Sequence, residues 1–402
     1  MEDALPKIRK YLDQSSTRFR YFIETLVRAE SPSLVPSSQI AVQSLITDQL
    51  RRLDYDVIHI PGQTTGGHLY AKPRNLNPRQ PKQLLLGHTD TVWPLGTLKE
   101  MPLVVKDNIM RGPGVYDMKA GIAMMIFALA AIRYAGLKPS VSPFLFLTSD
   151  EELGSPESMP RIKQLAMHMN RVFVLEPSMG KTGRLKTARK GVGQFNITAY
   201  GWASHAGLDP DRGASAIVGM SNVIQQLVAL NDREKGISVN VGTVRGGERA
   251  NMIAPECSID IDVRVPTVAA AKYIEKAIYS ITPNVPIVVL DIQGKMNRLP
   301  LERTPRNRAL WEIVKDIGLQ MDVQFEETMA GGGSDGNITS QYTATLDGLG
   351  AVGDGAHARH EFIYLDKLVE RTTLLAMLLL QPHALDYISV GTPIGSMAEL
   401  GD

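Results

Sequence analysis

Residues 144–152 read FLFLTSDEE, a run of apolar side chains that ends in three consecutive acids. An uninterrupted apolar run of this length, bounded by polar residues, is typical of a strand buried in a parallel sheet. A second run, LLLGHTD at 84–90, ends in a histidine and an aspartate. Because α/β sheets bind ligands at the carboxyl ends of their strands, the two stretches predict both an α/β fold and the edge that carries its site.

The segments around these two strands alternate between helical and extended patterns. Apolar positions recur at helical spacing over 4–29 and 38–53. We expect strands at 57–60, 84–87, 143–148 and 171–175, and further helices at 119–135 and 157–168. This succession predicts a mainly parallel sheet that is covered by helices on both faces.

From about Lys186 the pattern changes to strands with two-residue alternation. We expect strands at 193–200, 238–244 and 258–265, and helices at 213–230 and 267–281. After Asn297 the first pattern returns, with a helix at 306–317, a strand at 323–325 and a closing helix at 365–381. The chain therefore predicts an α/β domain made of 1–185 and 298–402, interrupted by a smaller α+β domain at 186–297.

Composition narrows the class of protein. The 402 residues include 43 Lys and Arg against 42 Asp and Glu, so no broad basic field exists to attract nucleic acid or an anionic membrane. The single cysteine, Cys257, excludes internal disulfides, and the charged N-terminus lacks the pattern of a secretory signal. The longest uncharged run, between Lys119 and Arg133, is too short to span a bilayer. We expect a cytoplasmic protein without a membrane anchor.

Carboxylates recur at the ends of the predicted strands. Asp117 closes the glycine-rich segment RGPGVYD, Glu151 and Glu152 close FLFLTSDEE, and Glu176 follows the strand VFVL. Taken singly, Asp117 reads as an ordinary helix cap, and the triple acid reads equally well as a solvated loop. Adjacent carboxylates repel one another, however, and their recurrence at one sheet edge indicates a cation site.

Histidines complete this set of candidate ligands. His88 follows the first strand, and His357 and His360 lie in the late loop GDGAHARHE. Carboxylate oxygens mixed with imidazole suit zinc, and two zinc ions bridged by one carboxylate form a common hydrolytic arrangement. The residues alone leave open which of the two late histidines is the ligand.

The motifs in this order resemble the zinc-dependent hydrolases that include glutamate carboxypeptidase, acetylornithine deacetylase and succinyl-diaminopimelate desuccinylase. The matching segments span nearly the whole chain: GHTDTV, RGPGVYDMKAG, TSDEE, LEPS, ASHAG, GGGSDGN and HARHE. The resemblance implies a zinc exopeptidase-like fold whose inserted domain acts as a lid and dimerises. It also implies a non-proline cis peptide between Asp117 and Met118.

The resemblance assigns roles to the candidate ligands. His88 and Glu176 would bind one zinc ion, Glu152 and His357 the other, and Asp117 would bridge both, with cobalt or manganese as possible substitutes. His357 is preferred to His360 because the family sets its histidine four residues before a glutamate, here Glu361. Glu151 would be the general base, and Asp90 would orient His88.

Further roles follow for the inserted domain and for one loop. His205, in ASHAG, would stabilise the oxyanion in the site of a partner subunit, and Arg264 and Asn251 would bind the substrate carboxylate. On the residues alone, His205 reads equally as a surface or capping residue, and the other two read as polar residues at strand edges. The glycine-rich loop lacks the ending of a nucleotide-binding P-loop. By resemblance it would line the substrate pocket through Gly332, Gly333 and Ser334.

The resemblance implies a dinuclear zinc hydrolase that cleaves an amide bond next to a free carboxylate in a small peptide or N-acyl amino acid. Glu176 and GGGSDGN favour a glutamate-type carboxypeptidase, with an N-acyl amino acid deacylase as the alternative. A metal-free binding protein of the same fold is the third hypothesis. A homodimer formed through the inserted domain is expected from the resemblance.

Overall fold

The computed structural model describes residues 3–382, and the tail after about Asp386, for which the sequence offered no interpretation, lies outside them. The chain divides into two compact units. The first comprises the residues up to Thr187, Arg303–Thr328 and those from Ser334 on, and the second comprises Ala188–Glu302 and Met329–Gly333. The inserted domain was expected at 186–297, whereas the second unit covers 188–302 and also takes in part of the glycine-rich loop.

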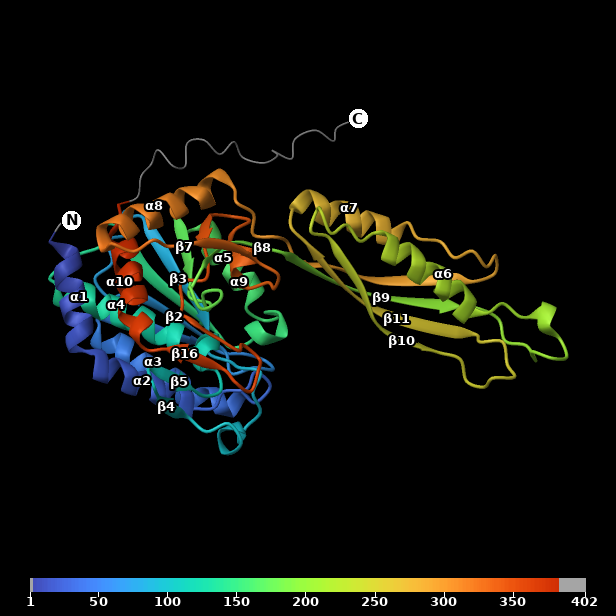
Figure 1. The fold of residues 1–402 in the computed structure, drawn as a ribbon, viewed down its shortest axis with the longest axis horizontal. Helices are drawn as coiled ribbons and strands as arrows, with labels where there is room; N and C mark the ends of the chain where they lie inside the picture. The colour runs from blue at the N-terminus through green and yellow to red at the C-terminus, as the bar shows by residue number, and fades with distance from the viewer. Residues whose placement is uncertain (1–2, 383–402) are drawn as a thin grey trace. The chain divides into compact units, whose positions relative to one another are not determined.

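A six-stranded sheet forms the centre of the first unit (Figure 1). Its strands, in spatial order, are β1 (Tyr55–Ile60), β2 (His68–Pro73), β6 (Ser142–Thr148), β3 (Lys82–His88), β7 (Arg171–Val174) and β14 (Ala344–Leu346). The pairs β6/β3, β3/β7 and β7/β14 are parallel, whereas β1/β2 and β2/β6 are antiparallel. The predicted fold class is confirmed: β6, β3, β7 and β14 run parallel, and β1 and β2 add an antiparallel pair at one edge.

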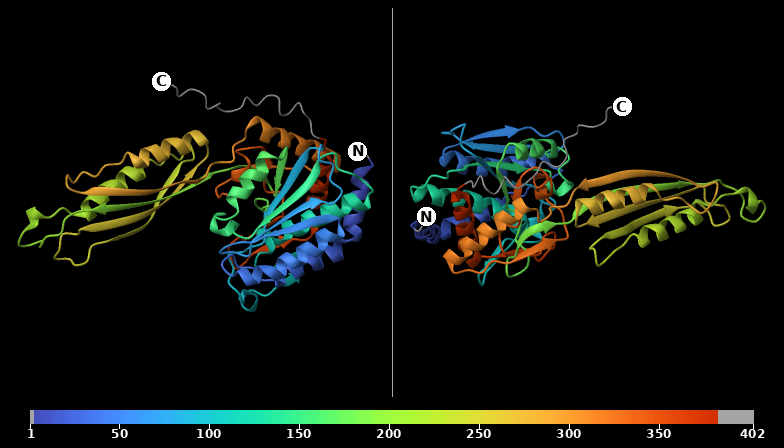
Figure 2. Two further views of the ribbon diagram at one scale, coloured as in Figure 1. Left: turned by 180° about the vertical axis from the view of Figure 1, so that it is seen from behind. Right: turned by 90° about the horizontal axis from the view of Figure 1, so that it is seen from above.

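Alternating side chains of the central strands divide the core into two layers. Leu85, Leu145 and Phe173 face one layer, whereas Leu84 and Phe146 face the other. The first layer is covered by α1 (Ala4–Gln14), α2 (Ser16–Arg28), α3 (Pro36–Arg52), α4 (Ala120–Tyr134), α8 (Pro305–Met321) and α10 (Asp366–Leu380). The second is covered by α5 (Met159–Met167) and α9 (Asp335–Thr339), so helices lie on both faces (Figure 2).

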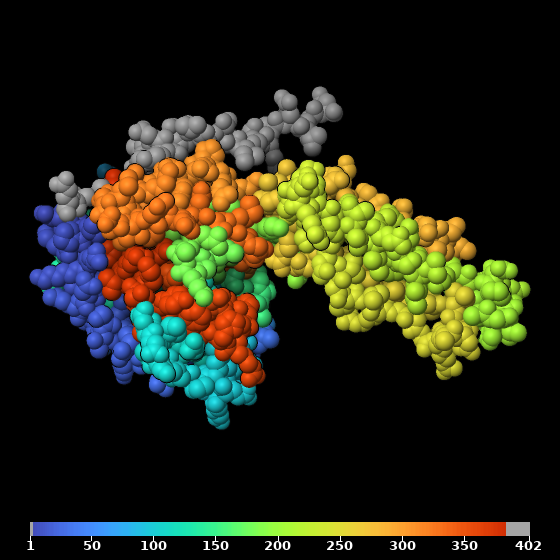
Figure 3. Space-filling model, in the orientation of Figure 1, coloured from blue at the N-terminus to red at the C-terminus, as the bar shows by residue number. Residues whose placement is uncertain are grey.

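Helix α4 is the core helix of this unit. The stretch Val115–Tyr134 is long and apolar enough to cross a membrane by length and composition, but 89% of it is buried inside the protein. It packs against α1 and α10, as expected for a helix covered on all sides. Helix α8, in contrast, forms part of the outer surface (Figure 3), and its Leu319 side chain is exposed.

Two elements of the first unit differ from expectation. The predicted helix over 4–29 is two helices, because the chain turns at Ser15. The predicted strand at 323–325 is wrong. Asp322 adopts φ +55° at the end of α8, the Val323 amide bonds back to the Gly318 carbonyl, and Phe325 packs on that same turn. These apolar residues therefore terminate a helix, and the neighbouring strand begins only at Glu327.

Several short strands were not predicted. A small antiparallel sheet has the order β15 (Gly353–Asp354), β16 (Phe362–Tyr364), β5 (Ile109–Arg111) and β4 (Val104–Lys106), and β8 (Leu185–Arg189) pairs with β13 (Glu327–Ala330). Strands of two to five residues are too short to show a periodic pattern. The small sheet nevertheless joins the loop after β15 to the segment that leads into α4.

The second unit is a four-stranded antiparallel sheet with helices on one face. Its order is β10 (Ser238–Gly246), β11 (Glu256–Val265), β9 (Gly191–Tyr200) and β12 (Val289–Arg298), and the helices are α6 (Ala216–Ala229) and α7 (Val268–Tyr279). Along β11, Ile259 and Ile261 are buried towards the helices, whereas Asp260 and Asp262 alternate with them on the other face. Strand β12 was missed because it lies at an edge and is largely exposed.

Candidate metal centre

The carboxyl ends of three neighbouring strands deliver most of the candidate ligands. His88 is the last residue of β3 and pairs in register with Thr148, the last residue of β6. Glu151 and Glu152 therefore follow β6 at the level of His88. Leu86 pairs with Val174 of β7, which places Glu176 at the same edge. Parallel register explains why acids from distant segments meet here.

Two loops supply the remaining ligands. Asp117 lies in the turn between β5 and α4, and His357 lies in the loop between β15 and β16. Because β5 and β16 pair with each other, these loops approach the sheet edge together. The peptide bond between Asp117 and Met118 is cis, which confirms the expectation drawn from the resemblance.

The two carboxylate oxygens of Asp117 face different histidines. Oδ1 lies 3.2 Å from Nε2 of His88, whereas Oδ2 lies 3.5 Å from Nε2 of His357. Glu176 Oε1 is 3.5 Å from the first imidazole, and Glu152 Oε2 is 3.0 Å from the second. The structure thus brings together all five predicted ligands, with Asp117 between two histidine–glutamate pairs.

These residues fit metal ions. Donor atoms around a tetrahedral zinc ion lie roughly 3.3–3.6 Å apart, close to the distances between imidazole nitrogens and carboxylate oxygens seen here. Ligand atoms of His88, Asp117 and Glu152 lie within 4.8 Å of one another, and so do those of His88, Glu151 and Glu176. Oε1 of Glu152 is buried without a hydrogen-bond partner among the described residues. Glu151 also lies at ligand distance, so its assignment as a base stays a prediction.

The pKa values show how strongly these groups interact. Burial lowers the pKa of His88, but hydrogen bonds to Asp117, Asp90 and Glu176 outweigh it and raise the pKa well above the usual range. Hydrogen bonds to Asp117 and Glu152 raise the pKa of His357 to about 10. Burial raises the pKa of Glu152 to about 7. Burial opposes ionisation of Asp117 too, but its histidine partners lower its pKa. The carboxylates of the centre are therefore stabilised by positive charge, which the protonated histidines supply here and a metal ion could supply instead.

Asp90 contacts the Nδ1 side of the His88 imidazole, as its expected role in orienting His88 requires. Nδ1 of His88 is 2.9 Å from the main-chain oxygen of Asp90 and 3.5 Å from its Oδ1. Donation from Nδ1–H to this carbonyl leaves Nε2 available as a ligand. Oδ2 of Asp90 also accepts hydrogen bonds from the Ser33 hydroxyl and the Glu152 amide. Asp90 therefore connects two candidate ligands, and its role in orienting His88 is supported by geometry.

The residues predicted in the second unit are described within that unit. His205 is exposed, and its Nδ1 accepts the amides of Gly207 and Leu208, each at 3.1 Å. The proton of the neutral imidazole must then lie on Nε2, which makes this nitrogen a donor. The Asn251 carbonyl accepts the Ala206 amide, so the segments of His205 and Asn251 are neighbours.

The guanidinium of Arg264 is hydrogen-bonded to a carboxylate of its own strand. Its guanidinium donates two hydrogen bonds to the Asp262 carboxylate, at 2.8 and 2.9 Å. A substrate carboxylate at Arg264 would share this guanidinium with Asp262. The substrate-binding roles of Arg264, Asn251 and His205 stay predictions.

The glycine-rich loop shows two kinds of environment. The carbonyls of Gly332 and Gly333 accept hydrogen bonds from Arg189 at 3.2 and 3.1 Å. Ser334 is fully buried, and its hydroxyl caps α9 while donating to Asp347. This geometry favours a structural role for the Ser334 side chain over contact with substrate.

Three residues near the centre were given no role in the site from the sequence. Burial raises the pKa of Asp117, its two histidines lower it, and the charge of Lys186 lowers it further. Nδ1 of the buried His68 lies 4.0 Å from Oδ1 of Asp150. Glu361 is fully buried and binds the turn of Asp117. Only Glu361 carried a signal, as the glutamate of HARHE; the others lie outside any recognisable motif.

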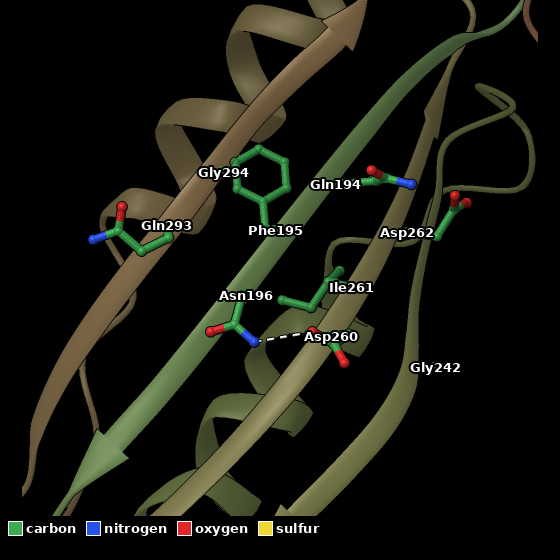
Figure 4. Close-up of a pocket in the computed structure, with 9 residues that line it drawn as sticks. All are labelled: Gln194, Phe195, Asn196, Gly242, Asp260, Ile261, Asp262, Gln293 and Gly294. Atoms are coloured by element: carbon green, nitrogen blue, oxygen red, sulfur yellow. Dashed lines mark hydrogen bonds between the residues drawn. The ribbon is translucent and has the colours of Figure 1, made fainter. Parts of the chain in front are cut away.

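A hollow of about 470 Å³ lies over the open face of the second sheet (Figure 4). Its polar groups are paired within the sheet. Asp260 accepts hydrogen bonds from Asn196 and Thr243, and Asp262 is held by Arg264. None of its nine lining residues is a histidine or cysteine. The hollow therefore does not resemble the metal centre.

A sheet edge that presents two histidines with a carboxylate between them is typical of a metal-dependent hydrolase. Residues 84–381 match the profile of Peptidase family M20/M25/M40, and the chain belongs to this family. It is accordingly a hydrolase of the metallopeptidase and amidohydrolase type. The general class predicted from the motifs is confirmed.

Two curated relatives show the range of the family. Carboxypeptidase G2 of Pseudomonas sp. (strain RS-16) is 25% identical over 369 residues, which cover 89% of this chain and 88% of the relative. Acetylornithine deacetylase of Erwinia tasmaniensis is 28% identical over 265 residues, 61% of this chain and 66% of the relative.

Solved structures share the fold. A tripeptidase from Staphylococcus aureus has a TM-score of 0.73 at 18% identity, covering 90% of this chain and 97% of its own. The Bacillus subtilis YXEP protein, described as a dinuclear metal binding peptidase, has a TM-score of 0.68 at 12% identity, covering 92% and 98%. At these identities the likeness establishes architecture alone.

Proposed function

We propose that this protein is a dinuclear zinc hydrolase that releases a C-terminal glutamate-like residue from a small peptide or N-acyl conjugate. The observation that carries the proposal is the placement of Asp117 between His88 and His357, each with its own glutamate. The extended similarity to carboxypeptidase G2, a carboxypeptidase by its name, supports release of a C-terminal residue. Cobalt and manganese are the substitutes we expect the same ligands to accept.

The residues divide the chemistry among them. Bound zinc would polarise the scissile carbonyl and lower the pKa of the attacking water. Glu151 takes the proton from that water and delivers it to the leaving amine nitrogen, so that the C–N bond breaks without release of an amide anion. Its position beside Glu176 and His88 supports this role. Asp90 holds His88 in the tautomer that a ligand requires.

The second unit would supply oxyanion and carboxylate contacts. The proton on Nε2 of His205 can be donated to an oxyanion, and the two amides on Nδ1 hold that tautomer. Asn251 and Arg264, together with the amides of Gly332 and Gly333, are the groups that we assign to the substrate carboxylate. We assign His205 to the site of the partner subunit.

A homodimer through the second unit is part of this proposal. Strand β10 is hydrogen-bonded only to β11 within the described sheet, and Val244 on it is 61% exposed. Ile217 and Val228, three helical turns apart on one face of α6, are also exposed. A free edge beside apolar side chains supports association of two copies. Val244→Lys should shift the protein to monomer in light scattering; an unchanged dimer, or a monomeric parent protein, contradicts the proposal.

A deacylase is the second candidate. The similarity to acetylornithine deacetylase favours it, because that relative acts on an N-acyl amino acid by its name. The two candidates share the metal centre and differ in which side of the amide carries the recognised group. Substrate comparison therefore separates them.

The test uses the full chain loaded with zinc, cobalt or manganese. We expect about two metal ions per chain and the highest kcat/KM on N-acyl-glutamate, compared with N-acetyl-ornithine and simple dipeptides. A higher kcat/KM on N-acetyl-ornithine would establish the deacylase. A protein that binds no metal and hydrolyses none of these substrates would refute the proposal. We also place the protein in the cytoplasm, since Cys257 is a free thiol, and fractionation of the source cells tests this.

A further inference from the structure

The carboxylate of Glu361 is buried and accepts four hydrogen bonds. Oε2 accepts the Trp93 indole N–H and the Gly114 amide, both at 2.8 Å. Oε1 accepts the amides of Tyr116 at 2.9 Å and Asp117 at 3.0 Å. Each oxygen thus has two donors, and three of the four donors belong to the turn that presents the bridging carboxylate.

The main chain of Glu361 is held beside the same turn. Phe362, the next residue, pairs in register with Arg111 as β16 pairs with β5, and the Gly112 amide bonds to the Glu361 carbonyl. The backbone therefore contacts the start of the segment leading to Asp117, while the side chain holds its end. The turn is clamped at both ends by a single residue.

Glu361 also ends the loop that carries His357. The Ala358 amide bonds to the Gly355 carbonyl at 2.8 Å, and the Glu361 amide bonds to the Ala358 carbonyl at 2.9 Å. His357 itself adopts φ +61°, a conformation that non-glycine residues hold only within a defined turn. These hydrogen bonds fix the loop that carries the His357 imidazole relative to the main chain of Glu361.

We infer that Glu361 is a positioning residue that couples Asp117 to His357 and so sets the spacing of the two metal positions. The inference rests on the proposed function, because only a dinuclear hydrolase requires two metal positions at a fixed spacing. Hydrogen bonds from N–H donors to a carboxylate are strong and directional, so four of them fix the turn relative to Glu361. Groups that orient metal ligands in this way typically change metal affinity by about 10–100-fold when altered.

Glu361→Gln is the informative substitution. The carboxamide keeps the size of the side chain, but its NH₂ group replaces an oxygen that accepted hydrogen bonds from two N–H groups. An NH₂ group cannot accept these hydrogen bonds. Either the Trp93 and Gly114 donors or those of Tyr116 and Asp117 lose their acceptor. Because the turn carries the bridging carboxylate, the loss displaces Asp117 from its two histidines.

A matched control separates positioning from general stability. The half-buried Glu30 carboxylate also accepts two main-chain amides, those of Gly96 at 2.8 Å and Leu98 at 2.9 Å. These amides belong to a loop that supplies none of the candidate ligands. Glu30→Gln therefore removes a similar carboxylate clamp without touching the turn of Asp117.

The experiment measures metal affinity by calorimetry, the visible absorption spectrum of the cobalt-loaded protein, and the melting temperature. We expect Glu361→Gln to raise the metal Kd by about 10–100-fold and to change the cobalt spectrum. Glu30→Gln should keep the parent Kd within about twofold, whatever it does to the melting temperature. Trp93→Phe removes one donor and leaves the carboxylate, so it should raise the Kd by a smaller factor.

The outcomes decide the inference as follows. A parent-like Kd and cobalt spectrum in folded Glu361→Gln would overturn it and leave Glu361 as a fold anchor only. If that variant does not fold, a parent-like Kd in Trp93→Phe overturns it equally. A parent protein that binds metal but hydrolyses no peptide or N-acyl amino acid would refute the proposed function while leaving this readout intact.

Discussion

Nε2 of His357 lies 3.0 Å from Oε2 of Glu152, although the two residues come from opposite halves of the chain. The histidine has its pKa raised to about 10 by hydrogen bonds to Asp117 and Glu152, and burial raises the pKa of Glu152 to about 7. Without a cation the pair therefore retains a proton at neutral pH. A metal ion bound by both residues must displace that proton.

Proton release on metal binding is the first prediction. At pH 7 the imidazole of His357 is protonated in the metal-free protein, and a ligand imidazole must be neutral. Metal affinity should therefore tighten as pH rises, by up to about tenfold per pH unit for each proton released. Calorimetry in buffers of different ionisation enthalpy at pH 7 should show at least about one proton released per chain. A binding enthalpy independent of the buffer would contradict this.

Glu151→Gln should separate chemistry from metal binding. The variant keeps the predicted ligands but cannot carry the proton of the attacking water, so turnover should fall by about three or more decades. Metal content, measured by mass spectrometry, should stay at the parent value. Glu234→Gln, an exposed glutamate of the second unit, serves as the control and should retain parent turnover. Near-parent activity in Glu151→Gln would remove the residue from its role.

The two late histidines provide another matched pair. His357 contacts Asp117 and Glu152, whereas the ring of His360 packs near Gly355. His357→Ala should lower metal content from about two ions per chain to about one and abolish most activity, because one position loses a ligand. His360→Ala should keep both ions. The reverse result would exchange the assignments of the two histidines.

Glu157 predicts how the fold responds to acid. Burial raises its pKa, but hydrogen bonds from Thr64, Gln63 and Thr65 outweigh this and lower the pKa to about 2 from a usual value of 4.5. A lowered folded-state pKa adds stability above pH 4.5 that is lost as pH falls towards 2. Urea unfolding should therefore show Glu157→Gln to be less stable than the parent at pH 7, with the gap closing near pH 2. A gap that does not depend on pH would count against this linkage.

Much of the fold and of the candidate site follows from local sequence patterns. The apolar runs of β3 and β6 and the acids after them could be recognised because side-chain burial and strand length repeat over a few residues. The ligand set could be listed for the same reason, since each ligand directly follows a strand or glycine-rich turn. Val323 and Phe325 show the weakness of such patterns. Their apolar spacing predicted a strand, but both residues pack at the C-terminal end of α8.

Local patterns thus offered the candidate ligands, and the resemblance selected His88, Asp117, Glu152, Glu176 and His357, but neither could say which oxygen of Asp117 faces which histidine. That arrangement depends on the register of parallel strands and on the pairing of β5 with β16, which join segments far apart along the chain. The four donors around Glu361 arise in the same way. Hydrogen bonds between distant segments produce no periodic pattern in the sequence, so only the tertiary structure shows them.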